Sequence, residues 1–93
     1  MSKVMAAAEV QVNVLFFAKS RELVGSKEAT LAVPAQTTSV QLLAAIVSRY
    51  PSLAVISNNL VLAVNQEYIA PGNDLLTLHP GDEVAVIPPI SGG

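Results

Sequence analysis

Cysteine and tryptophan are absent from the 93-residue chain, and histidine occurs only once. Without thiols the chain can form no disulfide and has no thiolate metal ligand or cysteine nucleophile. The single histidine, His79, is followed by Pro80-Gly81, a pattern typical of a turn. Because a metal site needs three or four ligands, we expect His79 to be a surface residue and predict no metal site.

Charge is also scarce, at 13% of the residues against about 25% in an average soluble domain. The chain has 5 basic and 7 acidic residues, which argues against a nucleic-acid partner, because binding phosphates requires a clustered positive surface. The longest unbroken apolar run, residues 42–47, is far shorter than the roughly 20 residues of a membrane-spanning helix. The sequence therefore predicts neither nucleic-acid nor membrane binding.

Hydrophobic residues make up 52% of the chain, which excludes intrinsic disorder. A domain of this size buries only about 60–70% of its unfolded surface, so some large apolar side chains must stay exposed, as they do at partner-binding surfaces. Residues 1–8 contain one lysine and no apolar segment like that of a secretory signal. We interpret them as a flexible leader and expect a cytosolic protein.

The first half of the chain contains the signals of two strands and a helix. Residues 9–17 alternate with period two, which predicts a strand whose apolar side holds Val10, Val12, Val14 and Phe16. Leu15 and Phe17 fall on the otherwise polar side. Residues 18–24 fit a short helix closed by Gly25, and residues 28–33 fit a second strand that ends at Pro34. We expect the two strands to pair as a hairpin.

The main helix is predicted after Thr38, which has the spacing of a capping box with Gln41. One face of this helix is expected to hold Leu43, Ile46, Val47 and Tyr50, and Pro51 ends it. Residues 60–64 are apolar without alternation, which is typical of a strand covered on both faces. Residues 68–69 and 83–87 are expected to form a short return strand and a last strand.

The main elements therefore follow the order strand, strand, helix, strand, strand. This order predicts an α+β domain over residues 9–87, with one main helix packed across a mixed sheet. No glycine-rich phosphate loop is present, so the chain is not expected to bind nucleotide by itself. The acidic pair Asp82-Glu83 is interpreted as a solvated turn, because adjacent strand residues point to opposite faces and cannot share a substrate.

The C-terminal segment, residues 88–93, is interpreted as an extended arm. Pro88 and Pro89 favour an extended backbone and remove hydrogen-bond donors, so the chain should leave the sheet stiffly. Ile90 and Ser91 follow, and Gly92 and Gly93 end the arm without side chains, which would let it enter a narrow channel. Six residues extend over roughly 20 Å, enough to place a terminal carboxylate in the active site of another protein.

The chain resembles a known family, the small subunits of molybdopterin synthase, which are ubiquitin-like sulfur carriers with a β-grasp fold. The resemblance covers residues 12–93 and is most specific at residues 14–18, 21–25, 63–66 and 80–85, and in the Pro-Pro and Gly-Gly pairs. Ser91 departs mildly from the family, whose members often have threonine there.

The resemblance implies a carrier that is a non-catalytic subunit of an enzyme complex. An E1-like adenylyltransferase would use ATP to activate the Gly93 carboxylate, and sulfur would then replace the adenylate to give a thiocarboxylate. The large catalytic subunit, in a heterotetramer of two small and two large subunits, would accept the arm formed by Pro88, Pro89, Ile90, Ser91 and Gly92. The sulfur would pass to cyclic pyranopterin monophosphate in molybdenum cofactor biosynthesis. No cofactor is expected on this chain itself.

The residues also predict where the large subunit docks. Phe17 lies opposite the apolar side of its strand, the segment 60–64 needs cover on two faces, and Ile87 ends the last strand. We expect Phe17, Tyr68 and Ile87 to form an apolar patch for this partner. Two alternatives stay open: a ubiquitin-like modifier that is conjugated to proteins, and an interaction module whose arm has no chemistry. Fold alone does not separate them.

Overall fold

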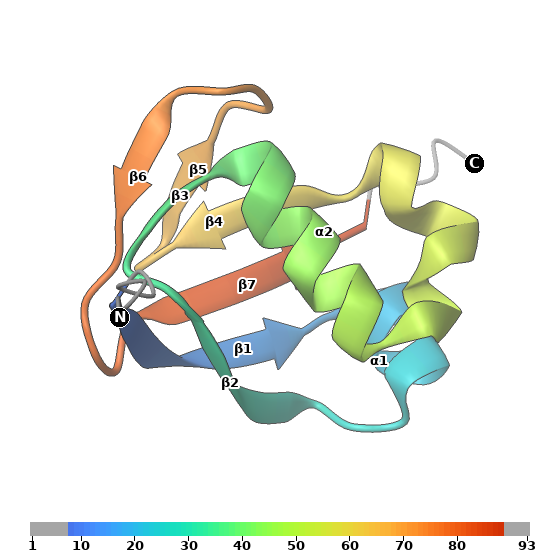
Figure 1. The fold of residues 1–93 in the computed structure, drawn as a ribbon. Helices are drawn as coiled ribbons and strands as arrows, with labels where there is room; N and C mark the ends of the chain where they lie inside the picture. The colour runs from blue at the N-terminus through green and yellow to red at the C-terminus, as the bar shows by residue number, and fades with distance from the viewer. Residues whose placement is uncertain (1–7, 89–93) are drawn as a thin grey trace, which may run out of the picture.

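The computed structural model describes residues 8–88, which form a sheet with helices on one face. Figure 1 shows the order of the elements, which are β1 (Glu9–Phe16), α1 (Ala18–Val24), β2 (Glu28–Pro34), β3 (Gln36–Thr38), α2 (Ser39–Arg49), the 3₁₀ helix η1 (Pro51–Asn59), β4 (Val61–Val64), β5 (Glu67–Ile69), β6 (Leu75–Thr77) and β7 (Glu83–Ile87). The α+β architecture with a main helix across a mixed sheet agrees with the prediction.

The main sheet has five strands in the order β2-β1-β7-β4-β5. β1 pairs antiparallel with β2, as the expected hairpin requires, and parallel with β7. β7 also pairs antiparallel with β4, so the strand that precedes the arm lies in the middle of the sheet. A second, two-stranded sheet of β3 and β6 was not predicted, because three-residue strands are too short to show a period.

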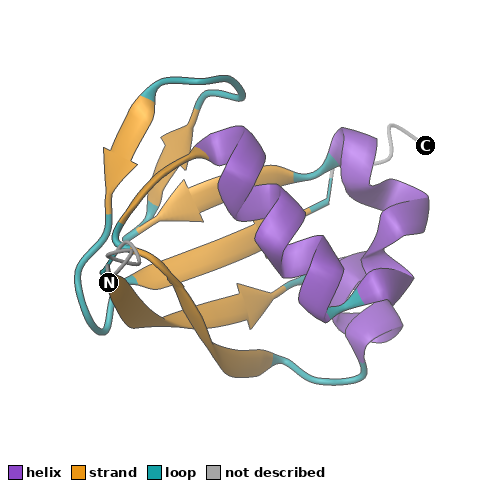
Figure 2. Cartoon of the chain, in the orientation of Figure 1, coloured by secondary structure: helices purple, strands orange, loops and turns teal. Residues whose placement is uncertain are grey.

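The hydrophobic core lies between the inner face of the sheet and the helices, which Figure 2 shows on one side of it. The alternation predicted for β1 is confirmed, since Val12 and Val14 are fully buried and Phe16 is 1% exposed. Phe16 packs edge-on against Tyr50, with ring centroids 5.2 Å apart. Because every second residue of β1 and β7 contributes to this core, the residues between them must point to the outer face.

The cap and the buried face of α2 agree with the sequence signals only in part. Thr38 caps the helix by accepting the Gln41 backbone N–H at 3.1 Å, but the Gln41 side chain does not return to the Thr38 backbone and instead lies 3.5 Å from the Thr37 hydroxyl. The fully buried residues of the helix face are Leu42 and Ile46, whereas the predicted Leu43, Val47 and Tyr50 are partly buried around them.

The 3₁₀ helix η1 is a second difference from the prediction, which placed one helix between β2 and β4. Pro51 ends α2 as expected, but it also begins η1, at a position where its missing N–H costs nothing. The buried Leu53 anchors η1 to the core. α2, α1 and η1 together cover the inner face of the sheet, so within residues 8–88 the outer face has no helix over it (Figure 1).

Candidate functional site

The strand register assembles an apolar row across four of the five strands on the outer face of the main sheet, next to the exposed Glu28 of β2, which pairs with Leu15. Leu15 of β1 pairs with Ala85 of β7, Ala85 pairs with Ala63 of β4, and Ala63 pairs with Tyr68 of β5. Residues paired in this way point to the same face of a sheet. Leu15, Ala63 and Ala85 lie beside core residues of their own strands, so the face that they share with Tyr68 is the outer one.

A second row lies at the end of the sheet from which the chain leaves β7. Ile87 pairs with Val61 of β4, and on the other side the Phe17 N–H lies 3.4 Å from the Val86 carbonyl oxygen. Phe17 keeps an extended backbone (φ −122°, ψ 149°), so its side chain continues the alternation of β1 and points opposite Phe16. We call the seven residues of both rows the outer face: Leu15, Phe17, Val61, Ala63, Tyr68, Ala85 and Ile87.

The predicted patch residues Phe17, Tyr68 and Ile87 all belong to this outer face. Phe17 is 47% exposed and Tyr68 is 74% exposed, whereas Ile87 is half-buried. At the centre of residues 60–64, Leu62 is buried in the core, and Ala63, on the outer face, is 4% exposed between Tyr68 of β5 and Ala85 of β7. Two large, exposed side chains above a floor of alanines are suited to an apolar partner, because their burial would remove apolar surface from water.

The floor of the outer face, Ala63 and Ala85, was missed by the sequence interpretation. Both alanines were assigned to strands, but nothing singled them out as part of a surface. The available signal was small residues between larger apolar ones in two strands that pair with each other. The two alanines pair with each other and lie between Leu15 and Tyr68 in the same row.

The arm begins beside the outer face. Ile87 is the last residue of β7, and the half-buried Pro88 follows it directly. The other predicted arm residues, Pro89, Ile90, Ser91, Gly92 and Gly93, lie outside the described residues. A chain that leaves the sheet at Ile87 therefore starts next to the two rows that would contact a partner.

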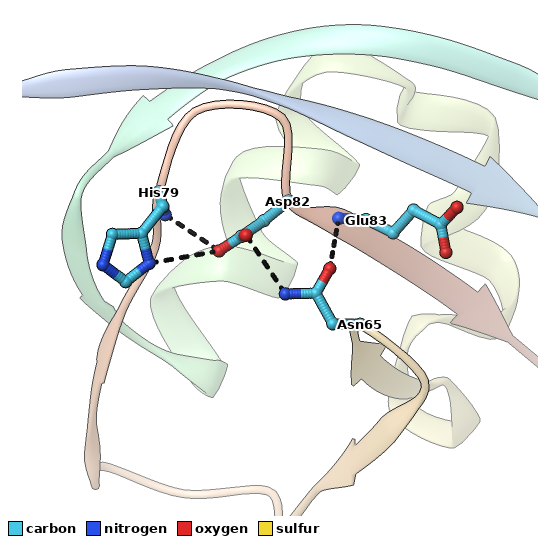
Figure 3. A network of polar contacts seen from close by, with 4 residues as sticks. All are labelled: Asn65, His79, Asp82 and Glu83. Atoms are coloured by element: carbon cyan, nitrogen blue, oxygen red, sulfur yellow. Dashed lines mark hydrogen bonds and ion pairs between the residues drawn. The ribbon is translucent and has the colours of Figure 1, made fainter.

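A polar cluster lies in the turns at the other end of β7 (Figure 3). Asp82 accepts the Asn65 side-chain N–H at 3.1 Å and the His79 backbone N–H at 2.8 Å, and His79 Nδ1 lies 3.7 Å from its carboxylate. The Asn65 side-chain oxygen in turn accepts the Glu83 backbone N–H at 2.9 Å. These contacts join the β4–β5 turn to the turn before β7.

Asp82 lies in the turn before β7, as predicted, where its partly buried side chain is 15% exposed and accepts two hydrogen bonds. The hydrogen bond from Asn65, and then that from the His79 backbone, hold the pKa of the Asp82 carboxyl below its ordinary value of 3.8. The carboxylate therefore has a structural role in closing two turns. His79 is exposed, as expected. Within residues 8–88 no three His, Cys, Asp or Glu side chains come together as metal ligands would.

The model of the ThiS family matches residues 14–93, nearly the whole of the described domain together with the arm. The chain belongs to the ThiS family. It is 52% identical to the human molybdopterin synthase sulfur carrier subunit over 83 residues, which cover 89% of this chain and 94% of the human protein. It is 49% identical to the protein of the same name from Drosophila simulans, over 90% of this chain and 92% of the fly protein. The predicted family resemblance is thereby confirmed.

Solved structures confirm the fold. The solution structure of small archaeal modifier protein 1 from Methanosarcina acetivorans is 25% identical, with a TM-score of 0.73 over 94% of this chain and all of that protein. A complex of subunits 1 and 2 of the molybdopterin-converting factor from Helicobacter pylori contains a chain with a TM-score of 0.63 and 23% identity, over 90% of this chain and all of that one. The ThiS-family domain described here therefore has the predicted ubiquitin-like β-grasp fold. None of its helices in residues 8–88 has the length and apolarity needed to cross a membrane.

Proposed function

We propose that this chain is the sulfur carrier subunit of a molybdopterin synthase. The observation that carries the proposal is its similarity to molybdopterin synthase sulfur carrier subunits over 89% of its length, at 52% identity for the human protein. The ThiS-family match extends to Gly93, the residue on which the chemistry would occur. The apolar outer face beside the start of the arm supports the same function, because a carrier must dock while its end reacts elsewhere.

The proposed chemistry takes place on the Gly93 carboxylate. A carboxylate resists substitution until one oxygen becomes a good leaving group, so an E1-like partner first joins it to the AMP part of ATP and releases pyrophosphate. A sulfide-level sulfur nucleophile supplied with the activating partner then attacks the carbonyl carbon, expels AMP and leaves a C-terminal thiocarboxylate. The soft thiocarboxylate sulfur attacks a carbon of cyclic pyranopterin monophosphate, and hydrolysis of the resulting thioester leaves the sulfur on the pterin and returns the Gly93 carboxylate. ATP is bound by the activating partner, and this chain needs no cofactor of its own.

The arm delivers the reacting group. Pro88 and Pro89 direct it away from the sheet, since proline fixes an extended backbone and donates no hydrogen bond. Ile90 and Ser91 follow, and Gly92 gives clearance in a narrow channel. Six residues beyond Ile87 reach roughly 20 Å, so the acceptor site can lie deep in the partner while the domain stays at its surface.

The partner that we propose for the outer face is the large catalytic subunit, in an assembly of two small and two large subunits in the cytosol. Burying Phe17 and Tyr68, together with the exposed part of Ile87, would provide the hydrophobic driving force for docking. Aromatic side chains are enriched at the centres of such interfaces, since each buries a large area with few rotatable bonds. The same face is open to the E1-like partner when the large subunit is absent.

The decisive experiment changes the length of the arm. Deleting Gly93, or adding one residue after it, should abolish sulfur transfer while the fold and the docking affinity stay as in the wild type. An added residue moves the reacting carbon by about 3.5 Å, whereas a misplacement of about 1 Å can cost a hundredfold in rate. Sulfur transfer is measured as molybdopterin formed in a synthase reaction reconstituted from purified subunits. Intact mass should show one oxygen of Gly93 exchanged for sulfur.

A bulky residue in place of Gly92 is the graded control for this experiment. It keeps Gly93 as the terminal residue and should reduce transfer without abolishing it, because it obstructs the channel and leaves the chemistry unchanged. If the extended arm still yields molybdopterin without being trimmed back to Gly93, the carrier function is wrong.

The similarity to a small archaeal modifier protein supports a second candidate, a modifier conjugated to other proteins. A modifier would leave isopeptide adducts between Gly93 and lysines of target proteins, which mass spectrometry of cell extracts detects. A third candidate, an interaction module without chemistry, predicts that removal of Gly92 and Gly93 is harmless. The arm-length experiment separates the carrier from the other two, since only the carrier requires Gly93 for molybdopterin synthesis, and the isopeptide adducts separate the modifier from the module.

A further inference from the structure

Ser20 in α1 has a fully buried side chain although it is polar. Its hydroxyl oxygen accepts the Phe17 backbone N–H at 3.0 Å and lies 2.7 Å from the Phe17 carbonyl oxygen. Ser20 therefore contacts both polar backbone groups of Phe17, the residue that caps α1. Without the hydroxyl the Phe17 N–H would keep only its 3.4 Å contact with the Val86 carbonyl oxygen, whereas the Phe17 carbonyl would keep the Ser20 and Arg21 backbone N–H groups as donors. The restraint on Phe17 therefore acts through its N–H, which the hydroxyl oxygen accepts.

The same hydroxyl reaches across to β7. Ser20 Oγ lies 3.1 Å from the Val86 carbonyl oxygen, which belongs to a residue 66 positions later in the chain. The last ladder contact between β1 and β7, from the Phe17 N–H to that carbonyl, is long at 3.4 Å. Ser20 therefore closes the end of the β1–β7 pair, where the departure of β1 into α1 would otherwise leave the pairing weak.

The turn from β1 into α1 needs such a restraint. Ala18 has a φ of 51°, in the left-handed region that residues with a Cβ rarely adopt. This conformation bends the chain into α1 directly after Phe17, whose side chain continues to point outward and is 47% exposed. A strained residue of this kind persists only where surrounding contacts hold it, and Ser20 supplies contacts on both sides of the bend.

We propose that Ser20 is a positioning residue for the outer face: its buried hydroxyl holds the Phe17 backbone against β7 and so sets the Phe17 side chain beside Ile87. The inference rests on the proposed function, since it takes the outer face as the docking surface for the large subunit. Ile87 directly follows Val86, so one hydroxyl governs the spacing of two patch residues at the start of the arm. Pre-organised side chains lose less freedom on binding, and this raises affinity.

The chain contains a matched control in Ser39, at the start of α2. Ser39 is 7% exposed, its hydroxyl accepts the Gly72 N–H at 2.8 Å, and it lies 3.1 Å and 3.0 Å from the Ala70 and Gly72 carbonyl oxygens. It makes the same kind of contacts as Ser20 but holds the loop after β5 instead of the β1–α1 bend. Ser20→Ala and Ser39→Ala should therefore lower Tm by similar amounts, about 4–8 °C each.

The affinity for the purified large subunit separates the two variants. Measured by isothermal titration at a temperature where both variants are folded, Ser20→Ala should weaken binding about fivefold and Ser39→Ala less than twofold. In a Phe17→Ala background, Ser20→Ala should weaken binding by less than a further twofold, because the side chain that Ser20 positions is gone. Unchanged affinity in Ser20→Ala, equal losses in both serine variants, or full additivity with Phe17→Ala would overturn the proposal.

Amide exchange on the isolated chain tests the positioning without a partner. Ser20→Ala should speed exchange of the Phe17 amide, and Ser39→Ala should leave it at the wild-type rate. If the Phe17 amide exchanges equally in both variants, Ser20 does not position it. If the wild-type chain fails to bind the large subunit while this exchange difference is present, the proposed function fails and the structural role of Ser20 stands.

Discussion

The inner face of the main sheet is lined with apolar residues, whereas the outer face is apolar toward the Ile87 end of β7 and polar at the other end, where Asn13 pairs with Glu83. Alternate residues of β1 and β7 point inward and are fully buried under the helices, as Val14 and Val84 are. The residues between them point outward, to the face on which Phe17, directly after β1, and Tyr68 of β5 are exposed. Phe16 and Phe17 adjoin in sequence but are 1% and 47% exposed. Apolar character on both faces of a strand therefore indicates two surfaces with different uses, one for the core and one for a partner.

The largest expected effect is a loss of stability from a substitution in the inner face. Phe16→Ala should lower the free energy of unfolding by about 3–5 kcal/mol, because it leaves a cavity and removes the edge-on contact with Tyr50. Phe17→Ala should cost less than about 1 kcal/mol, since its side chain is half exposed before the change. Urea unfolding of the two variants measures the difference. Equal losses for the two phenylalanines would mean that the outer face is part of the core.

The next largest effect is expected on binding, from substitutions in the outer face. Phe17→Asp and Ile87→Asp should weaken binding to the large subunit by more than they lower stability, because a charge buried unpaired at an interface costs several kcal/mol. Titration of each variant against the large subunit, together with thermal melts, separates the two quantities. Val55→Asp is the matched control, since it adds the same charge at an exposed apolar residue of η1, on the side of the sheet that the helices cover. Wild-type affinity with a collapsed melt would assign these residues to the core.

The outer face could be predicted from the sequence because period two places side chains without knowledge of the fold. Leu15 and Phe17 fall on the polar side of β1 by counting alone, and Ile87 follows from the alternation of β7. The strand neighbours of each residue required the structure, since the parallel pairing of β1 with β7 joins the two ends of the chain. Ser20 could not be predicted for the same reason: its contact with Val86 spans 66 positions.

The two helical regions show a similar limit. α2 was predicted because Thr38 caps it and Pro51 ends it, and both are local signals. η1 was missed because its residues 51–59 combine apolar with Ser and Asn side chains in no helical period, and a single buried residue, Leu53, fixes it to the core. Local signals therefore predict elements with caps and periods, whereas elements held by one tertiary contact need the structure.

The smallest effect is expected at the polar end of β7, where Asp82 lies, opposite the apolar end at the outer face. It is a loss of stability that depends on pH. Because Asn65 and the His79 backbone lower its pKa in the folded chain, the ionised Asp82 carboxylate stabilises the fold. This stabilisation is fully present above the unfolded value of about 3.8 and is lost as the pH falls through the lower folded value. Asp82→Asn cannot ionise, so it should melt below the wild type at pH 6.

The difference in Tm between wild type and Asp82→Asn should therefore shrink as the pH falls below about 3.8 and should be smallest near pH 2, where the wild-type carboxyl is protonated too. Thermal melts from pH 2 to pH 7 measure it, and Asp74→Asn, at an exposed position, serves as a control that should follow the wild type. Because the cluster lies at the opposite end of β7 from Ile87, Asp82→Asn should keep wild-type affinity for the large subunit at pH 7. A Tm difference that stays constant across this range would show that the carboxylate charge does not stabilise the turns. The cluster would then stabilise them through the geometry of its hydrogen bonds, independently of charge.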